Sequence, residues 1–392
     1  MRIGFDLRTL QGHSRYRGIG RNVAMILKNI SKIDKKNTYI FYLFDGLDNP
    51  LVGLGLQDYF RYELRHVKER KLPNKRVIGI IFDEFKPVDV ANDKIDVFYQ
   101  PDVSYGIPKS VRSVLVFYDL IPFYFWHKNK FRRNLILYYK DEAINRLFRR
   151  RYLRTIRNYK KADRIISISG FSKKDLIKNF PEIDENRVSV VYLASDTIFN
   201  KKISTTENKS DDYILYVGGA DQRKNIDGLI NIFYKLKEKH KKLKLVLVGK
   251  EFNVEKELRH YPWFNEIKDN IYFKDIVFVE YVEDQELISL YSKAKVFAFA
   301  SKYEGFGLPI LEAMSIGVPV VAFNNSSIPE VAGSSAILCD NNNQFVAAVS
   351  EIIDSPAKRK EIVEKGVEQS KKFEWLNTAK ETLKIIEEEA MK

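Results

Sequence analysis

Cysteine is almost absent from this 392-residue sequence, since Cys339 is the only one, so no disulfide can form within the chain. That excludes the disulfide-stapled class of small secreted proteins and fits a reducing compartment. We interpret Cys339 as a small buried apolar residue. The sequence also lacks an Asp-x-Asp triplet and any cluster of His and Cys at zinc-site spacing. We therefore expect no metal and no bound cofactor.

Long apolar runs are missing as well. No stretch approaches the ~20 apolar residues that a membrane-spanning helix needs. The longest, residues 114–126, contains Asp119 and Pro122 and is better explained by a core strand that leads into a loop. At the N-terminus, Asp6 follows before any apolar run develops, so we expect no signal peptide. These features predict a cytoplasmic protein.

Acidic residues are outnumbered, with 52 Asp and Glu against 66 Lys and Arg, for a net charge of +14. Much of the excess lies in residues 128–164, where basic and apolar residues alternate at helical spacing. Such a surface suits anionic lipid headgroups, which predicts peripheral contact with the inner face of the cytoplasmic membrane. The alternative is an ordinary solvated helix. No nucleic-acid-binding motif accompanies the charge, so we expect no nucleic acid partner.

The chain has the length of two domains and alternates strand and helix patterns, which predicts an α/β fold with parallel sheets. Residues 201–211 are polar and aperiodic, and we interpret them as a linker. We expect an N-terminal domain at 1–200, a C-terminal domain at 201–372 and a final helical segment at 373–392. The strands expected are residues 2–6, 38–44, 97–99, 113–117 and 164–169, then 213–217, 243–248, 276–279, 296–300 and 318–322.

The segment 301–322, SKYEGFGLPILEAMSIGVPVVA, is the most informative part of the chain. Glu304 and Glu312 flank a loop with two glycines that runs into a helix. Pro309 favours the start of that helix and Gly317 its end. The helix start offers N–H groups to an anion, and the carboxylates suit hydroxyl groups. A sugar nucleotide carries both.

A second group of residues suited to ligand binding lies upstream, at 218–225. Gly218 and Gly219 follow a predicted strand, and Arg223 and Lys224 come just before a helix that begins near Asn225. Ligands of doubly wound sheets bind beyond the carboxyl ends of the strands. The two positive charges and the helix N–H groups would therefore converge on a diphosphate.

These segments resemble the Glu-x7-Glu signature of the retaining glycosyltransferases of family four, and among them the bacterial polysaccharide mannosyltransferases. Other similar segments follow in order over more than 300 residues: 17–21, 119–122, 168–172, 223–225, 281–287 and 326–333. The resemblance implies the GT-B fold, with two doubly wound Rossmann-like domains facing across a cleft. It also implies that the final helix crosses back to the N-terminal, acceptor-side domain.

The resemblance implies roles for individual residues. Arg223 and Lys224 would neutralise the leaving diphosphate, Glu304 would hold the sugar hydroxyls, and Glu312 would hold the ribose. Many family members have a histidine where this chain has Tyr118, so no imidazole role is carried over, and Asp119 becomes the acid of interest. The expected catalytic residues are Glu304, Asp119, Arg223 and Lys224. The expected substrate-binding residues are Gly18, Gly20, Tyr118, Gly218, Gly219, Val282, Gly305, Phe306, Gly307, Leu308 and Glu312.

The resemblance further implies metal-independent transfer of a hexosyl group with retention, from a nucleotide sugar to a saccharide acceptor that we expect to be lipid-linked, in cell-surface polysaccharide synthesis. GDP-mannose is the first donor expected, with UDP-glucose and UDP-N-acetylhexosamine as alternatives. Front-face departure is favoured, and double displacement stays open. Two other hypotheses are a GT-B epimerase or phosphorylase, and a non-catalytic subunit that binds sugar or a polyanion.

Overall fold

The computed structural model describes residues 1–12, 18–68, 87–125, 152–153, 155–200, 212–253, 258 and 261–392. Most of the basic segment predicted at 128–164 lies outside the described residues, as does the whole predicted linker at 201–211. The chain divides into two compact units. Unit 1 comprises Met1–Phe123, Glu142–Leu193 and Glu374–Lys392, and unit 2 comprises Tyr124–Asp141 and Ala194–Phe373.

Unit 1 is built on a seven-stranded sheet of order β3-β2-β1-β4-β5-β6-β7. Every neighbouring pair of strands is parallel. The central strands are almost entirely buried because their side chains are apolar on both faces, as a parallel sheet covered by helices requires. The strands are β1 (Arg2–Asp6), β2 (Thr38–Phe44), β3 (Arg61–Val67), β4 (Val97–Gln100), β5 (Arg112–Phe117), β6 (Arg164–Ser167) and β7 (Val188–Val190).

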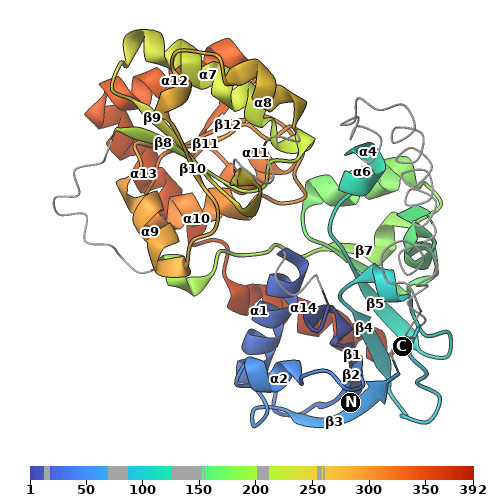
Figure 1. Ribbon diagram of the computed structural model, residues 1–392. Helices are drawn as coiled ribbons and strands as arrows, with labels where there is room; N and C mark the ends of the chain where they lie inside the picture. The colour runs from blue at the N-terminus through green and yellow to red at the C-terminus, as the bar shows by residue number, and fades with distance from the viewer. Residues whose placement is uncertain are drawn as a thin grey trace. The chain divides into compact units, whose positions relative to one another are not determined.

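The last helix of the chain belongs to unit 1. This helix, α14 (Trp375–Ala390), lies beside α1 (Gly18–Ile33) (Figure 1). Its C-terminal part is fixed by polar contacts, since Glu387 accepts a hydrogen bond of 2.8 Å from Asn37 and Glu389 one of 2.8 Å from Arg112. Among the described residues, other helices near this sheet are α2 (Pro50–Gly53), α4 (Ile121–Phe125) and α6 (Gly170–Asn179), and residues 155–161 are helical as well.

Unit 2 has a six-stranded sheet of order β10-β9-β8-β11-β12-β13, again parallel throughout. Its strands are β8 (Tyr213–Val217), β9 (Lys244–Val248), β10 (Ile276–Val279), β11 (Val296–Phe299), β12 (Val320–Phe323) and β13 (Ile337–Cys339). Its helices are α7 (Ile226–Lys239), α8 (Pro262–Ile267), α9 (Asp284–Lys293), α10 (Leu308–Ile316), α11 (Ile328–Ala332), α12 (Asn342–Asp354) and α13 (Pro356–Ser370).

The predicted α/β class with two Rossmann-like parallel sheets is confirmed. The sequence missed β3, β7 and β13, each of which is the edge strand of its sheet. Cys339 ends β13 and is buried, as predicted. Within the described part of the chain, none of the helices has the length and apolar composition that a membrane crossing requires.

Candidate functional site

The strand order of unit 2 reverses between β8 and β11, which are hydrogen-bonded neighbours. The chain that follows each strand emerges at the same edge of the sheet. After β8 come Gly218 and Gly219, and after β11 comes the segment 301–307, which we call the glycine loop. Ligands of doubly wound sheets bind in the crevice at such a switch point.

Three charged side chains meet there. The guanidinium of Arg223 donates to Glu304 Oε2 at 2.8 Å, and the ammonium of Lys224 donates to Glu304 Oε1 at 2.7 Å. We call Arg223, Lys224 and Glu304 the charge cluster. Arg223 Nε also lies 3.1 Å from a carboxylate oxygen of Asp221. The sequence predicted a role for each cluster member but not that Glu304 would bind both cations.

Two members of the charge cluster are buried, since Glu304 and Lys224 are each 7% exposed, and Arg223 is half-buried. Burial by itself would raise the pKa of Glu304, but the charges of Lys224 and Arg223 outweigh it and hold that pKa below its usual value. Burial lowers the pKa of Lys224, although the carboxylate of Glu304 opposes that shift. Asp221, which is exposed, is a second carboxylate beside Arg223, so two carboxylates face the two cations and an anionic ligand would bind by replacing one of them.

The backbone that carries the two cations is held by a left-handed residue. Asn225 adopts φ +56° and donates from Nδ2 to the carbonyl oxygen of Ala300 at 3.1 Å. This inward side chain needs Gly228, because a Cβ there would lie 2.5 Å from Asn225 Nδ2. In addition, the amide of Lys302 donates to the carbonyl oxygen of Arg223 at 2.7 Å. The turn and the glycine loop are therefore one connected structure.

The glycine loop ends as the sequence predicted. Gly307 has φ +109° directly before α10, Pro309 lies in the first turn of that helix, and Gly317 ends it with φ +88°. Gly305, Phe306 and Leu308 accompany it, so the predicted amide donors all belong to one loop and helix start. Because helix N-termini often bind anions, this loop and helix start are a candidate anion site.

The segment 325–327 fixes the other side of the loop. Asn325 Nδ2 donates to the carbonyl oxygen of Ser301 at 3.0 Å, and Ser326 Oγ accepts from the amide of Glu304 at 3.0 Å. The hydroxyl of Ser327 lies 3.0 Å from the carbonyl oxygen of Glu304 and 2.8 Å from that of Phe306. The sequence marked this segment as family-like, but its clamping role was missed, because side-chain contacts to backbone leave no periodic pattern.

Glu312 lies on α10 and is 5% exposed. Its Oε2 accepts a hydrogen bond of 3.1 Å from the hydroxyl of Tyr291, a buried residue of α9. Nothing in the sequence pointed to Tyr291 as a partner of Glu312. The contact fixes one oxygen of the carboxylate and thereby its orientation.

Close packing explains glycine at 218, where a Cβ would lie 2.6 Å from the Tyr216 hydroxyl oxygen, but not at 219, where a Cβ would make ordinary contacts. A Cβ on Gly249, which follows β9, would lie 1.9 Å from the carbonyl oxygen of Gly218, and Gly218 itself has φ +153°. The carbonyl oxygen of Gly219 accepts from the Tyr216 hydroxyl at 2.8 Å. Val282 is half-buried in the segment between β10 and α9.

The predicted residues of unit 1 lie at the carboxyl edge of its own sheet. Tyr118 follows β5, its hydroxyl accepts from Asn22 Nδ2 at 2.9 Å, and burial raises its pKa well above the usual value. Asp119 Oδ1 accepts from the amide of Ile121 at 2.9 Å, so this carboxylate orients the turn into α4.

One expectation about unit 1 needs correction. Gly18 and Gly20 were expected in a loop approaching the ligand, but both lie in the first turn of α1. The helix begins earlier because Gly18 through Asn22 continue directly into its apolar face. The preceding residues 13–17 lie outside the described residues.

Comparison with known proteins identifies the domain that carries the charge cluster. Residues 197–369 match the family described as "Glycosyl transferases group 1". This range includes Arg223, Lys224, Glu304 and Glu312.

Curated relatives include the O-antigen chain mannosyltransferase B of Escherichia coli, 30% identical over 56% of this chain and 59% of its own length. The serotype-specific mannosyltransferase WbdA of Escherichia coli is 27% identical over 97% of this chain and 47% of its own length. The chain thus spans about half the length of these relatives.

Solved structures with a similar fold include HepE from Anabaena in complex with UDP and glucose, with a TM-score of 0.67 and 15% identity over 99% of this chain and 100% of that one. WaaG, a glycosyltransferase involved in lipopolysaccharide biosynthesis, has a TM-score of 0.64 and 13% identity over 98% of this chain and 99% of that one. At such low identity these likenesses establish the fold alone, which is GT-B.

Proposed function

We propose that this protein transfers a hexosyl group from a nucleotide-diphosphate sugar to a saccharide acceptor, because residues 197–369 match the glycosyl transferases group 1 family. The observation that carries the proposal is the charge cluster at the strand-order switch of unit 2. There, Arg223 and Lys224 are held side by side by Glu304.

The proposed chemistry follows from this arrangement. When the glycosyl bond breaks, negative charge develops on the diphosphate, and preorganised cations lower the energy of that state. The side chains of Arg223 and Lys224 would turn toward the phosphate oxygens. The N–H groups at the start of α10 would donate to the same phosphate oxygens. Glu304 would then accept hydrogen bonds from the sugar hydroxyls.

Glu312 would bind the ribose hydroxyls with the carboxylate oxygen that Tyr291 does not fix. Gly218, Gly219 and the backbone of 305–308 would allow the donor to lie close to the main chain. Val282 would border the base. Among these contacts, that of Glu312 would place a carboxylate opposite hydroxyl groups of the donor.

We propose a metal-independent reaction with retention, in which the leaving phosphate helps to deprotonate the acceptor. The two cations would supply the charge that a divalent ion supplies elsewhere. The donor we propose is GDP-mannose, which is supported by relatives named mannosyltransferases of O-antigen chains.

The acceptor we propose is a lipid-linked saccharide in cell-surface polysaccharide synthesis. Its binding residues would include Tyr118 and the first turn of α1 in unit 1. We further propose that this protein is cytoplasmic and associates peripherally with the inner face of the cytoplasmic membrane.

The test is calorimetric titration with GDP, UDP and ADP, followed by incubation with the matching sugar nucleotides and a saccharide acceptor. We expect GDP to bind, and the anomeric configuration of the product, read by NMR, to match that of the donor. Binding of UDP instead would change the donor to UDP-glucose or UDP-N-acetylhexosamine. Absence of binding by every nucleotide would refute the transferase proposal and favour a non-catalytic subunit.

A further inference from the structure

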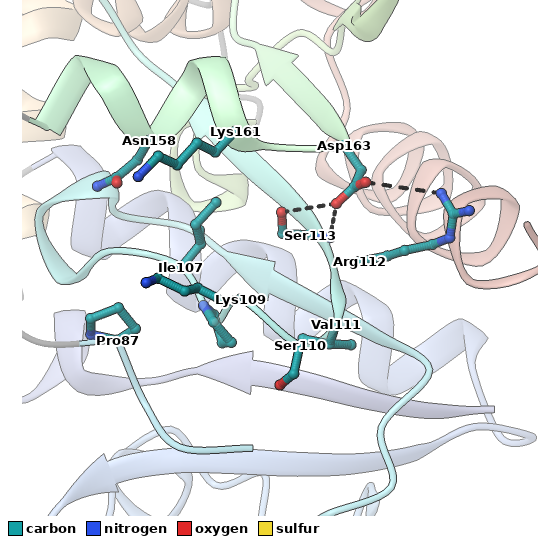
Figure 2. A pocket seen from close by; sticks show the side chains of 11 residues that line it. Pro87, Ile107, Lys109, Ser110, Val111, Arg112, Ser113, Asn158, Lys161 and Asp163 are labelled. Carbon is teal, nitrogen blue, oxygen red and sulfur yellow. Dashed lines mark hydrogen bonds and ion pairs between the residues drawn. The ribbon is translucent and has the colours of Figure 1, made fainter. Parts of the chain in front are cut away.

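A second concave site lies in unit 1, at the amino end of β5 and thus at the sheet edge opposite Tyr118 and Asp119 (Figure 2). Its volume is about 610 Å³, within the usual range of small-molecule pockets. The lining residues come from the loop before β5, from the start of β5, from the helical residues 155–161 and from Pro87. Neither the predicted site nor the similarity to known proteins assigns it a role.

The local backbone explains why the pocket exists. Gly106 has φ +69° and no side chain, so the ring of Pro87 packs closely on it; a Cβ there would lie 3.1 Å from Pro87 Cγ. The chain then turns outward, and Ile107, Pro108 and Val111 give the pocket an apolar part. Ile107 belongs to the buried core beneath, which makes this part rigid.

The charges around the pocket are unequal. Asp163 accepts from the amide of Ser113 at 2.8 Å and lies 3.9 Å from Arg112, which donates to Glu389 at 2.8 Å. This acid and this arginine are therefore neutralised within the fold, as the dashed lines in Figure 2 show in part.

Two further cations are not neutralised. Lys109 and Lys161 line the pocket and are exposed, and neither has a carboxylate partner among the residues that the structure describes. Figure 2 shows Lys161 and Asn158 extending from the helix and Lys109 from the facing loop, with their nitrogen ends on the same side of the view. Ser110 adds a hydroxyl to the lining.

We propose that this pocket binds a phosphate group, through the ammonium groups of Lys109 and Lys161 and the polar groups of Ser110 and Asn158. A lysine ammonium is a compact point charge with three donors, which suits a phosphate oxygen. The apolar part would contact the carbon portion of the ligand. The phosphate comes either from a soluble phosphorylated compound or from the headgroup of an anionic lipid. The proposal does not rest on the glycosyltransferase assignment.

The test compares the full chain with the double variant Lys109→Ala/Lys161→Ala and with a control, Lys160→Ala/Lys174→Ala. The control removes the same charge, and Lys160 neighbours Lys161, but neither control residue lines the pocket. All four lysines are exposed, so both variants should fold. The probes are inorganic phosphate by calorimetry, and vesicles of phosphatidylcholine with and without phosphatidylglycerol by sedimentation.

We expect the affinity of the pocket variant for one of these probes to be at least tenfold lower than that of the natural chain. The affinity of the control variant should stay within twofold of that of the natural chain. Loss for phosphate alone identifies a soluble ligand, and loss for phosphatidylglycerol vesicles alone identifies a lipid headgroup. The proposal is overturned if neither probe binds the natural chain, if the pocket variant binds both probes unchanged, or if the control loses as much as the pocket variant.

Discussion

The two parallel sheets each hold a buried ion pair beyond their carboxyl ends, but the pairs connect different parts of the chain. In unit 1, Arg8 binds Asp6, which lies two residues away, with Nε–Oδ1 and Nη2–Oδ2 distances of 3.0 and 2.6 Å. In unit 2, Glu304 binds Lys224 across 80 residues of sequence. The first pair shapes one loop, whereas the second joins two loops.

This difference separates a structural pair from a candidate functional one. The guanidinium of Arg8 lies over the rings of Tyr105 and Phe44, 4.4 and 5.7 Å from their centroids, and is enclosed by the protein. In the charge cluster, Glu304 binds two cations that lie just before α7, and Arg223 also faces the exposed carboxylate of Asp221, so an incoming anion can replace a carboxylate as their partner. The comparison predicts that unit 1's pair contributes to stability alone, whereas unit 2's charge cluster contributes both to stability and to ligand binding.

The largest expected effect is on stability, in unit 1. Arg8→Met leaves the carboxylate of Asp6 buried and unpaired, which costs about 3–5 kcal/mol in the free energy of unfolding. Urea denaturation measures this loss. The double variant Asp6→Leu/Arg8→Met removes both charges and should recover most of it. If the double variant were as unstable as the single one, the ion pair would not be the cause.

The second prediction concerns unit 2. Lys224→Ala removes a cation that would stabilise the departing diphosphate, and loss of one such group lowers kcat by about 10²–10³-fold. Steady-state kinetics with the donor found by calorimetry measures it. Lys235→Ala is the matched control, because Lys235 lies on the adjacent helix α7 and its ammonium donates to the exposed Asn343 at 3.3 Å, away from the charge cluster. A folded Lys224→Ala protein with full turnover would contradict the assignment of the charge cluster.

The third prediction concerns the pH dependence of stability. The folded-state pKa of Glu304 lies below 4.5, so its ionised form stabilises the fold above that pH, and this contribution is lost as pH falls through the folded-state pKa. Glu304→Gln should therefore cost about 3 kcal/mol near neutrality, as loss of one member of a buried pair does. The difference between the two proteins should shrink below pH 4.5. A difference that stays constant from pH 7 to pH 3 would show that the pairing is not responsible.

The sequence predicted the parts of the fold that have a local signature. Tyr213–Val217 and Ile276–Val279 are apolar runs, and both were placed with their observed bounds. In contrast, β3, which like β10 is an edge strand, has the sequence RYELRHV, in which charged residues recur at every second position and no residue is fully buried. These residues form a strand because they pair with β2, and a local sequence pattern carries no information about that pairing.

The candidate site likewise combines residues that a local pattern reveals with contacts that no local pattern reveals. The sequence predicted Gly307 and Gly317 because glycine is common at helix ends. It predicted Arg223 and Lys224 because two adjacent cations precede a predicted helix. The contacts of Glu304 with both cations, and of Glu312 with Tyr291, join segments that are far apart in sequence. They depend on how the loops fold back at the switch point.

A smaller effect is expected from the clamp on the glycine loop. Ser327→Ala removes the hydroxyl that lies between the carbonyl oxygens of Glu304 and Phe306 and leaves buried acceptors unpaired, at a cost of about 1–3 kcal/mol. We expect nucleotide affinity to fall with stability, because the same loop carries Glu304. Calorimetry and urea denaturation of one preparation measure both. Unchanged affinity with lowered stability would separate the loop from the binding site.

The smallest effect is expected at Tyr291. Tyr291→Phe removes the donor to Glu312 Oε2 but keeps the ring, which packs against Phe199 and Phe297. One neutral donor to a carboxylate contributes about 1.5 kcal/mol, so we expect nucleoside diphosphate affinity to fall about tenfold. The matched control is Tyr234→Phe, which removes a hydroxyl that donates to the Ile267 carbonyl oxygen at 2.8 Å elsewhere in unit 2. If both variants lost affinity equally, the hydroxyl of Tyr291 would act only through stability. A loss confined to Tyr291→Phe would show that Glu312 must be oriented before it can bind the ribose, as unit 2's role in ligand binding requires.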